Sequence, residues 1–219
     1  DVLCVDKTGT ITEPDMKVED VFLCKGVNSS IDYSDFEKLL FSYALASKDN
    51  NATMQALKEY ANKKGIKGDV DATVKVLPFS SSLKYGSITF EEGCYILGAP
   101  EIILKGNFIS FENEILNYTE KGSRVLLFAK YDGCNIEDGI NGNVTPIGFI
   151  AFENPIRENA IDTFNYFKSQ GVDIKVISGD NPLTVSQIAS KAGIENAENY
   201  IDASLLDTDK KIQEAISFY

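Results

Sequence analysis

The chain opens with an apolar run, Val2-Leu3-Cys4-Val5, that leads straight into a polar turn. The turn reads Asp6-Lys7-Thr8-Gly9-Thr10. Short apolar runs of this kind are typical of buried parallel strands, and open α/β sheets carry their functional groups where such strands end. A Gly-containing turn at that point can surround an anion with backbone N–H groups. The sequence therefore predicts an α/β sheet whose first strand presents the Asp6 carboxylate at a functional edge.

Each of the five turn residues suits phosphoryl chemistry. The Asp6 carboxylate can attack a phosphoryl group and form an aspartyl phosphate. Lys7 would neutralise phosphate charge, the hydroxyls of Thr8 and Thr10 would donate hydrogen bonds to phosphate oxygens, and Gly9 would let the backbone approach closely. The alternative is an ordinary strand-to-loop turn with solvated polar side chains. Because all five residue types follow one strand, the sequence favours the phosphoryl site.

Composition and charge exclude several classes of partner and site. The chain has 219 residues, of which 43% are hydrophobic and 25% charged, as in soluble globular proteins. Its formal net charge of -12 makes nucleic acid and anionic membrane surfaces poor partners. The sequence contains no histidine, which excludes Ser–His–Asp catalysis and His-ligated metal sites. The cysteines form no C-x-x-C pair, so neither a zinc site nor a redox motif is indicated.

The sequence also bears on location. No apolar run approaches the roughly 18 consecutive residues of a membrane span, and no charged-then-apolar leader is present. The chain begins inside a strand, close to its most reactive residue. We therefore expect an excised cytoplasmic piece of a longer protein.

Two patterns along the chain predict its domains. Residues 1–15 are expected to form a strand and a catalytic loop, and a second α/β pattern covers residues 147–219. In this second segment we expect strands at 147–152 and 172–177 and helices at 157–170 and 182–192. The segment between, 16–146, has helical runs at 35–47 and 51–64, followed by short strands with turn signals. The sequence predicts an α/β domain of residues 1–15 and 147–219, with an α+β domain of residues 16–146 inserted after its first strand.

The run over residues 6–12, ending in Ile11-Thr12, resembles the phosphorylation signature of the P-type ion-transporting ATPases, a branch of the haloacid dehalogenase superfamily. The resemblance implies that Asp6 takes the γ-phosphate of ATP. It also implies that Mg²⁺ is held partly by the Asp6 carboxylate and the Thr8 backbone carbonyl. The fold it implies is a partial Rossmann-like haloacid dehalogenase domain with a large inserted antiparallel-sheet nucleotide-binding domain.

Further motifs in the inserted segment resemble the nucleotide site of the same family. Phe79 and Lys84 match residues that stack on adenine and contact the nucleotide, with a core Phe and a solvated Lys as the alternative. Gly98 and Ala99 match a small-residue pair that leaves room for adenine. In the family a lysine precedes that pair, whereas Leu97 stands here.

Two more segments of the inserted domain bear on ATP binding. Arg124 lies in a Gly-x-Arg-Val-Leu segment whose arginine reaches the nucleotide phosphates, a task suited to its planar fork. The alternative is a surface arginine that begins a strand. Met54 stands where the family has a glutamate facing the adenine amino group. With Leu97 and Met54 in place of polar partners, we expect weak ATP binding.

The returning α/β segment carries the last motifs. Arg157 matches the nucleotide-contacting arginine of an Asp-Pro-x-Arg hinge, although Asn154 replaces the aspartate. Ser178 and Asp180 match the Thr-Gly-Asp-Asn turn, whose hydroxyl bonds the transferring phosphoryl group at a helix amino end. The alternative is an ordinary helix-capping turn. The late acidic loop that completes the family's Mg²⁺ site does not occur before Tyr219.

The resemblance implies the cytoplasmic ATP-binding and phosphorylation part of an integral membrane cation transporter. ATP and Mg²⁺ would be its cofactors, and the transmembrane and actuator domains of the parent chain its partners. The lack of histidine favours calcium or magnesium transport over heavy-metal transport, and we expect this piece alone to be inactive. One alternative is a soluble haloacid dehalogenase-type phosphatase with a large cap domain, and another is a non-catalytic nucleotide-binding regulator. Thr8 argues against the phosphatase, which typically has a second aspartate there.

Overall fold

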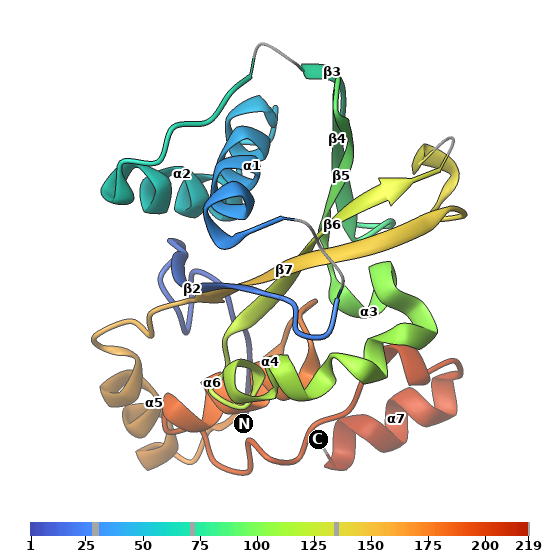
Figure 1. Ribbon diagram of the computed structural model, residues 1–219. Helices are drawn as coiled ribbons and strands as arrows, with labels where there is room; N and C mark the ends of the chain where they lie inside the picture. The colour runs from blue at the N-terminus through green and yellow to red at the C-terminus, as the bar shows by residue number, and fades with distance from the viewer. Residues whose placement is uncertain (28–30, 71–72, 134–135, 219) are drawn as a thin grey trace. The chain divides into compact units, whose positions relative to one another are not determined.

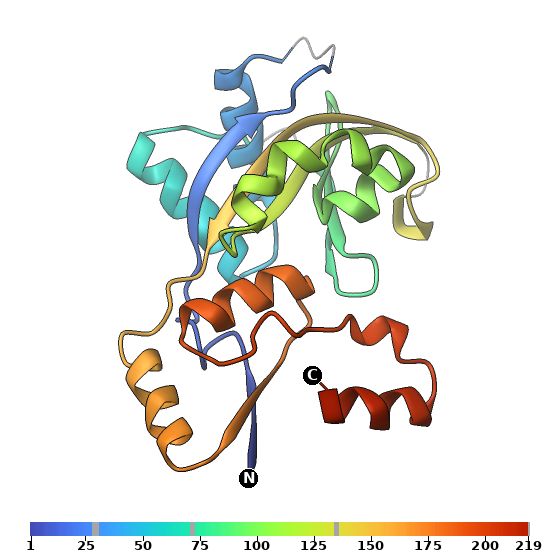
Figure 2. The same ribbon diagram turned by 90° about the horizontal axis from the view of Figure 1, so that it is seen from below.

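The computed structural model describes residues 1–27, 31–70, 73–133 and 136–218. The chain forms two compact units, which Figures 1 and 2 show in ribbon form. The larger unit comprises Met16–Asn117 and Arg124–Glu153. The smaller unit comprises Asp1–Asp15, Tyr118–Ser123 and residues 154–219. The predicted combination of a parallel α/β part with an antiparallel α+β part is confirmed, and the predicted domain boundaries stay a prediction.

A six-stranded antiparallel sheet forms the larger unit, in the order β2-β7-β6-β5-β4-β3. Its strands are β2 (Lys17–Leu23), β3 (Thr73–Ser80), β4 (Tyr85–Phe90), β5 (Gly93–Gly98), β6 (Arg124–Asp132) and β7 (Asn143–Glu153). The strands β3 to β6 follow one another as antiparallel neighbours, as the predicted short strands and turn signals indicate. β7 and β2 then complete the sheet at its other end.

Helices cover both faces of this sheet (Figure 1). On one face, α1 (Tyr33–Ala46) and α2 (Ala52–Lys64) bury an aromatic core in which the Tyr95 and Phe128 rings stack at 5.6 Å. On the other face lie α3 (Pro100–Leu104), the 3-10 helix η1 (Lys105–Ser110) and α4 (Glu112–Thr119). There the Phe149 ring packs against Phe111. The sheet is thus buried on both sides.

The smaller unit is built on two parallel strands, β1 (Val2–Asp6) and β8 (Asp173–Ile177). Its helices are α5 (Ala160–Ser169), α6 (Pro182–Lys191), the 3-10 helix η3 (Ala203–Leu205) and α7 (Asp209–Phe218). Ile11, Phe164 and Ile188 lie in its hydrophobic core. Within the described ranges of the chain, no helix is both long and apolar enough to cross a membrane.

One strand prediction placed a real strand in the wrong sheet. Residues 147–152 were expected to open the returning α/β segment, but they lie in β7 and pair antiparallel with β6 and β2. The sheet assignment was wrong because residues 147–152 of β7 are buried between helices on both faces of the sheet and are all apolar or glycine. A continuous apolar run does not distinguish such a strand from a buried parallel one.

The helix expected from residue 157 begins at Ala160 instead. The backbone N–H of Arg157 donates to the carbonyl of Ile11, and Thr12 forms an isolated bridge with Ile156. Residues 156 and 157 are therefore held by the loop that follows β1 rather than by the helix.

A polar cluster ties α1 to α2. One oxygen of Glu37, Oε1, accepts hydrogen bonds from Lys64 Nζ at 2.7 Å, Tyr60 Oη at 2.8 Å and Tyr33 Oη at 3.0 Å. The Lys64 ammonium also lies 4.7 Å from the centroid of the Tyr60 ring. Burial raises the pKa of the Glu37 carboxyl, but the hydrogen bonds from Lys64, Tyr60 and Tyr33 lower it more, so the net pKa lies below its ordinary value of 4.5.

We expect Glu37→Gln to destabilise the larger unit by about 1 kcal/mol, because the ion pair is partly open to solvent. Since folding lowers the pKa of Glu37, its stabilisation is fully present above the unfolded value of 4.5 and is lost as pH falls through the folded pKa. Urea unfolding of both proteins at several pH values checks this. The gap between them should narrow steadily below pH 4.5. A gap that does not change with pH would contradict the assignment.

Candidate functional site

The Asp6 turn has the expected position at the end of a strand. β1 ends at Asp6, whose side chain is exposed. The backbone N–H groups of Ile11 and Thr12 both donate to the Lys7 carbonyl, at 3.0 and 3.1 Å, and this closes a compact loop. Gly9 adopts a φ of 79°, which favours glycine at that position. The loop thus holds Asp6 at the carboxyl edge of the two-stranded sheet.

The second predicted motif meets the first at this edge. In the parallel register Asp6 lies beside Ile177, so Ser178 continues from β8 next to the end of β1. Asp180 then reaches the Asp6 turn, because its Oδ2 lies 2.5 Å from Lys7 Nζ. The structure therefore brings four predicted catalytic residues together, namely Asp6, Lys7, Ser178 and Asp180.

The Lys7–Asp180 pair is largely buried. The Lys7 side chain is 2% exposed and that of Asp180 28%. A buried ammonium is costly unless it is paired, so this contact fixes the two loops to each other. Lys7 was predicted to neutralise phosphate charge, and here its ammonium binds a carboxylate, which leaves that role a prediction.

The turn at residues 178–181 also caps a helix. The Asn181 side chain accepts the Leu183 N–H at 3.0 Å, and Pro182 begins α6. The backbone N–H of Asp180 donates to Ser178 Oγ at 3.3 Å. The helix-capping and phosphoryl-binding interpretations of this turn are therefore compatible. The amino end of a helix needs a capping side chain and also attracts anions.

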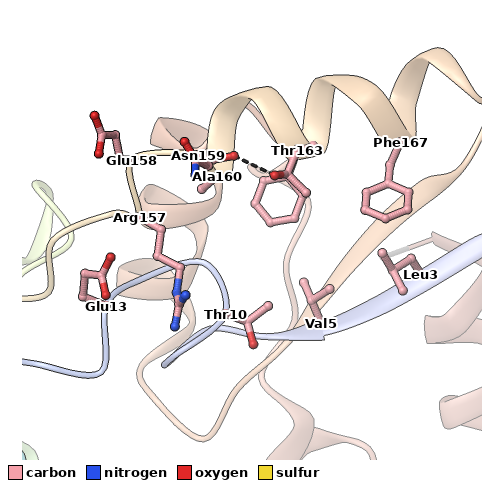
Figure 3. Close-up of a pocket in the computed structure, with 11 residues that line it drawn as sticks. Leu3, Val5, Thr10, Glu13, Arg157, Glu158, Asn159, Ala160, Thr163 and Phe167 are labelled. Atoms are coloured by element: carbon pink, nitrogen blue, oxygen red, sulfur yellow. Dashed lines mark hydrogen bonds between the residues drawn. The ribbon is translucent and has the colours of Figure 1, made fainter.

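Arg157 lies on the rim of a cavity of about 500 Å³ between β1 and α5 (Figure 3). Leu3, Val5, Phe164 and Phe167 are among its apolar lining residues. The Arg157 side chain extends toward the loop that carries Thr10 and Glu13 (Figure 3), and its Nε donates to the Thr12 carbonyl at 3.4 Å. Arg157 therefore joins the segment before α5 to the loop that follows β1, and its contact with nucleotide stays a prediction.

Four predicted nucleotide-binding residues meet at one end of the larger sheet. Lys84 adopts a φ of 62°, and its carbonyl accepts the Ala99 N–H at 3.0 Å. Gly98 pairs with Tyr85, and a Cβ at Gly98 would lie only 2.4 Å from the Lys84 carbonyl oxygen. Phe79 precedes the same turn and is 37% exposed. The alternative of a core Phe79 is therefore wrong.

The structure shows a steric requirement for glycine at position 98 that was not evident from the sequence. The Lys84 carbonyl and the Tyr85 backbone lie too close to Gly98 to leave space for a side chain. Arg124 begins β6, the strand that pairs with β5, and is half-buried. Its position at the start of a strand agrees with the alternative interpretation, and a phosphate contact of Arg124 stays a prediction.

Met54 and Leu97 both lie in the hydrophobic core of the larger unit. Met54 is 5% exposed and Leu97 3% exposed, and they belong to one cluster of buried side chains. At the two positions where the resemblance implies polar partners for adenine, this chain packs apolar side chains. Asn154, the third departure, has a buried Nδ2 with no hydrogen-bond partner in the described structure.

One polar neighbour of the candidate nucleotide site was not singled out from the sequence. The backbone N–H of Phe79 donates to Asp49 Oδ2 at 2.9 Å. Asp49 lies between α1 and α2, 30 residues before Phe79 in the chain. No local sequence pattern reports a contact of this separation.

Comparisons with known proteins show the family of the chain. Residues 1–214 match the model of the haloacid dehalogenase-like hydrolases. The chain is 37% identical over 218 residues to a probable cation-transporting ATPase, exp7, of Streptococcus pneumoniae, covering 97% of this chain and 26% of that protein. It is 33% identical over 219 residues to the calcium-transporting ATPase CtpE of Mycolicibacterium smegmatis, covering 99% and 26%. The chain thus spans about a quarter of the length of the curated relatives it matches.

Solved structures share the fold. A crystal structure of a zinc-transporting PIB-type ATPase matches with a TM-score of 0.54 and 19% sequence identity, over 89% of this chain and 28% of that chain. A second crystal structure of a zinc-transporting PIB-type ATPase, in another state, matches with a TM-score of 0.52 and 20% identity. At this level of identity the likeness shows the fold alone.

Proposed function

Because the chain belongs to the haloacid dehalogenase-like hydrolase family, we propose that it is the ATP-binding and aspartyl-phosphorylation part of a P-type ATPase. In this proposal the longer protein couples ATP hydrolysis to cation transport across a membrane. ATP bound by the larger unit donates its γ-phosphoryl group to Asp6. The observation that carries the proposal is the meeting of the Asp6 turn with the Ser178–Asp180 turn at one sheet edge.

The groups around Asp6 suit in-line attack on a phosphoryl group. The Asp6 carboxylate is exposed at the strand end, so it can reach a ligand without rearrangement of the core. Attack by a carboxylate oxygen on the γ-phosphorus forms the acyl phosphate and releases ADP as the leaving group. Ser178 Oγ and the Thr8 hydroxyl would donate hydrogen bonds to the phosphoryl oxygens. The amino end of α6 adds a favourable dipole for the same charge.

The residues present fit a weakly held Mg²⁺. Among the described residues no group of three or more His, Cys, Asp or Glu side chains is placed to hold a metal ion. Mg²⁺ nevertheless commonly uses one or two protein carboxylates and keeps several waters. The Asp6 carboxylate and the Thr8 backbone carbonyl would supply its protein oxygens. When bound, the ion would neutralise charge on the transferring phosphoryl group.

The proposal extends to location and partners. The chain would lie on the cytoplasmic face of a membrane, joined to the transmembrane and actuator domains of its parent. The relatives named for cation and calcium transport support a cation as the cargo. The histidine-free sequence favours calcium or magnesium among cations.

We expect ATP to bind the larger unit against Phe79 with a Kd on the order of 1 mM, or about -4 kcal/mol. The affinity should be low because Met54 and Leu97 are buried in the core and offer the base no polar contact. NMR titration of the chain with ATP checks this. Shifts should centre on residues 79–84 and 97–99, and Phe79→Ala should weaken binding about tenfold or more. Shifts elsewhere, or an unchanged affinity in Phe79→Ala, would contradict the site.

A further inference from the structure

The strand β3 departs from regular pairing where it reaches Phe79. Its register with β4 shifts between Leu77 and Ser80, so Pro78 and Phe79 lie outside the ladder. Proline has no N–H to donate. The Phe79 N–H is released from the sheet by this irregularity and is free to donate to an acceptor outside the ladder. Asp49 Oδ2 supplies it at 2.9 Å.

Asp49 is itself held in place by the end of α1. Ser47, the C-cap residue of that helix, donates its N–H to the Tyr43 carbonyl at 2.9 Å. Ser47 Oγ then accepts the Asp49 N–H at 3.2 Å and donates to Asp49 Oδ2 at 3.4 Å. The carboxylate that binds Phe79 is therefore anchored, through Ser47, to a helix packed in the core.

The irregular segment of β3 also packs closely on its neighbours. A Cβ at Gly86, on β4, would lie 3.1 Å from both the Phe79 nitrogen and the Leu77 carbonyl oxygen. The same Cβ would lie 3.2 Å from the Tyr43 hydroxyl. The backbone at Phe79 is thus fixed on one side by β4 and on the other by Asp49, while the residue as a whole remains 37% exposed.

We propose that Asp49 is a positioning residue for nucleotide binding, which holds the Phe79 backbone so that the exposed ring is presented to the base. This inference rests on the proposed function, since it needs a base to stack on Phe79. An exposed ring on an irregular strand end loses conformational freedom when a ligand binds. A charge-assisted hydrogen bond that fixes the backbone beforehand lowers that cost. Asp49 thereby contributes to affinity without contacting the base.

The test compares ATP binding by the 219-residue chain and its variants, using NMR titration. Asp49→Ala removes the acceptor and should weaken binding about tenfold. Asp49→Asn keeps an amide oxygen as a neutral acceptor and should weaken it about threefold. Lys48→Ala, a neighbour in the same loop, serves as the matched control and should bind like wild type.

A double-mutant cycle separates positioning from a general structural effect. If Asp49 acts through the Phe79 ring, Asp49→Ala should have no further effect in a Phe79→Ala background. Hydrogen exchange of the Phe79 amide should also be faster in Asp49→Ala, whereas amides of β6 should keep their protection. Urea unfolding of each variant shows that the chain remains folded under the binding conditions.

Each outcome decides a different point. The role of Asp49 would be overturned if Asp49→Ala bound ATP as tightly as wild type. It would also be overturned if Asp49→Ala lost the same ATP affinity with Phe79 present and in the Phe79→Ala background. Either result would leave the proposed function standing. A wild-type chain that does not bind ATP at Phe79 would overturn the proposed function, and the role of Asp49 with it. The proposal is supported if Asp49→Ala lowers ATP affinity only when Phe79 is present.

Discussion

If the chain belongs to a P-type ATPase as proposed, an Asp6→Asn variant of that longer protein should form no phosphoenzyme when it is incubated with γ-labelled ATP and Mg²⁺. Asparagine keeps the size of the side chain but lacks the anionic oxygen that attacks phosphorus. Because no other carboxylate in the 6–10 loop can replace it, we expect the acid-stable label to fall by a factor of about 1,000 or more. This is the largest effect that the proposed function predicts.

A second aspartate of the same unit provides the control. Asp15 is exposed and lies well beyond the Asp6 turn in the chain, so Asp15→Asn makes the same chemical change away from the strand end. We expect it to be labelled like wild type. The label on the active proteins should be released by hydroxylamine, as an acyl phosphate requires. Equal hydroxylamine-sensitive label on Asp6→Asn and wild type would exclude Asp6 as the acceptor.

Removal of the Asp180 carboxylate should give the largest loss of stability. The Lys7 side chain is 2% exposed, and Asp180→Ala leaves its ammonium without the carboxylate that lies 2.5 Å away. Breaking a buried pair by removing one partner typically costs about 3–5 kcal/mol, because the remaining charge is uncompensated. The partial exposure of Asp180 places our expectation at about 3 kcal/mol, the lower end of that range.

Hydrogen exchange of the β1 and β8 amides measures this loss in the smaller unit, separately from the larger one. Lys7→Met in the Asp180→Ala background should recover part of the stability, since it removes the unpaired charge. Asp162→Ala, at an exposed position on α5, is the matched control and should change protection little. If Asp180→Ala lowers the free energy of unfolding of the smaller unit by less than about 1 kcal/mol, the Lys7–Asp180 pair is not the buried contact that holds the two turns together.

Elements whose signals are local were predicted well from the sequence. The helix expected over residues 51–64 is α2, with Asn51 as its N-cap and Gly65 in the left-handed conformation as its C-cap. The strand-end position of Asp6 was also predicted, because an apolar run followed by a polar turn is a local signal. Caps and strand ends depend on a few neighbouring residues, so a sequence pattern is enough to find them.

Contacts between distant segments were not predictable in the same way. The Lys7–Asp180 pair joins two turns through the register of β1 and β8, and the two motifs were identified separately in the sequence. The Asp49–Phe79 hydrogen bond depends on a register shift in β3 that no residue pattern reports. The sheet that contains residues 147–152 was misassigned for a related reason, since burial of both faces hides strand direction. Tertiary packing, rather than local propensity, sets each of these features.

Mapping of the covalent phosphate tests the central claim most directly. The longer protein proposed to contain this chain is incubated with ATP and Mg²⁺, quenched in acid and reduced with borohydride, which converts an aspartyl phosphate to homoserine. Mass spectrometry of the peptide that contains residues 1–17 then locates the modified residue. The account predicts homoserine at position 6 only in the protein incubated with ATP. Phosphate retained on Thr8, Thr10 or another hydroxyl, with Asp6 unchanged, would contradict it.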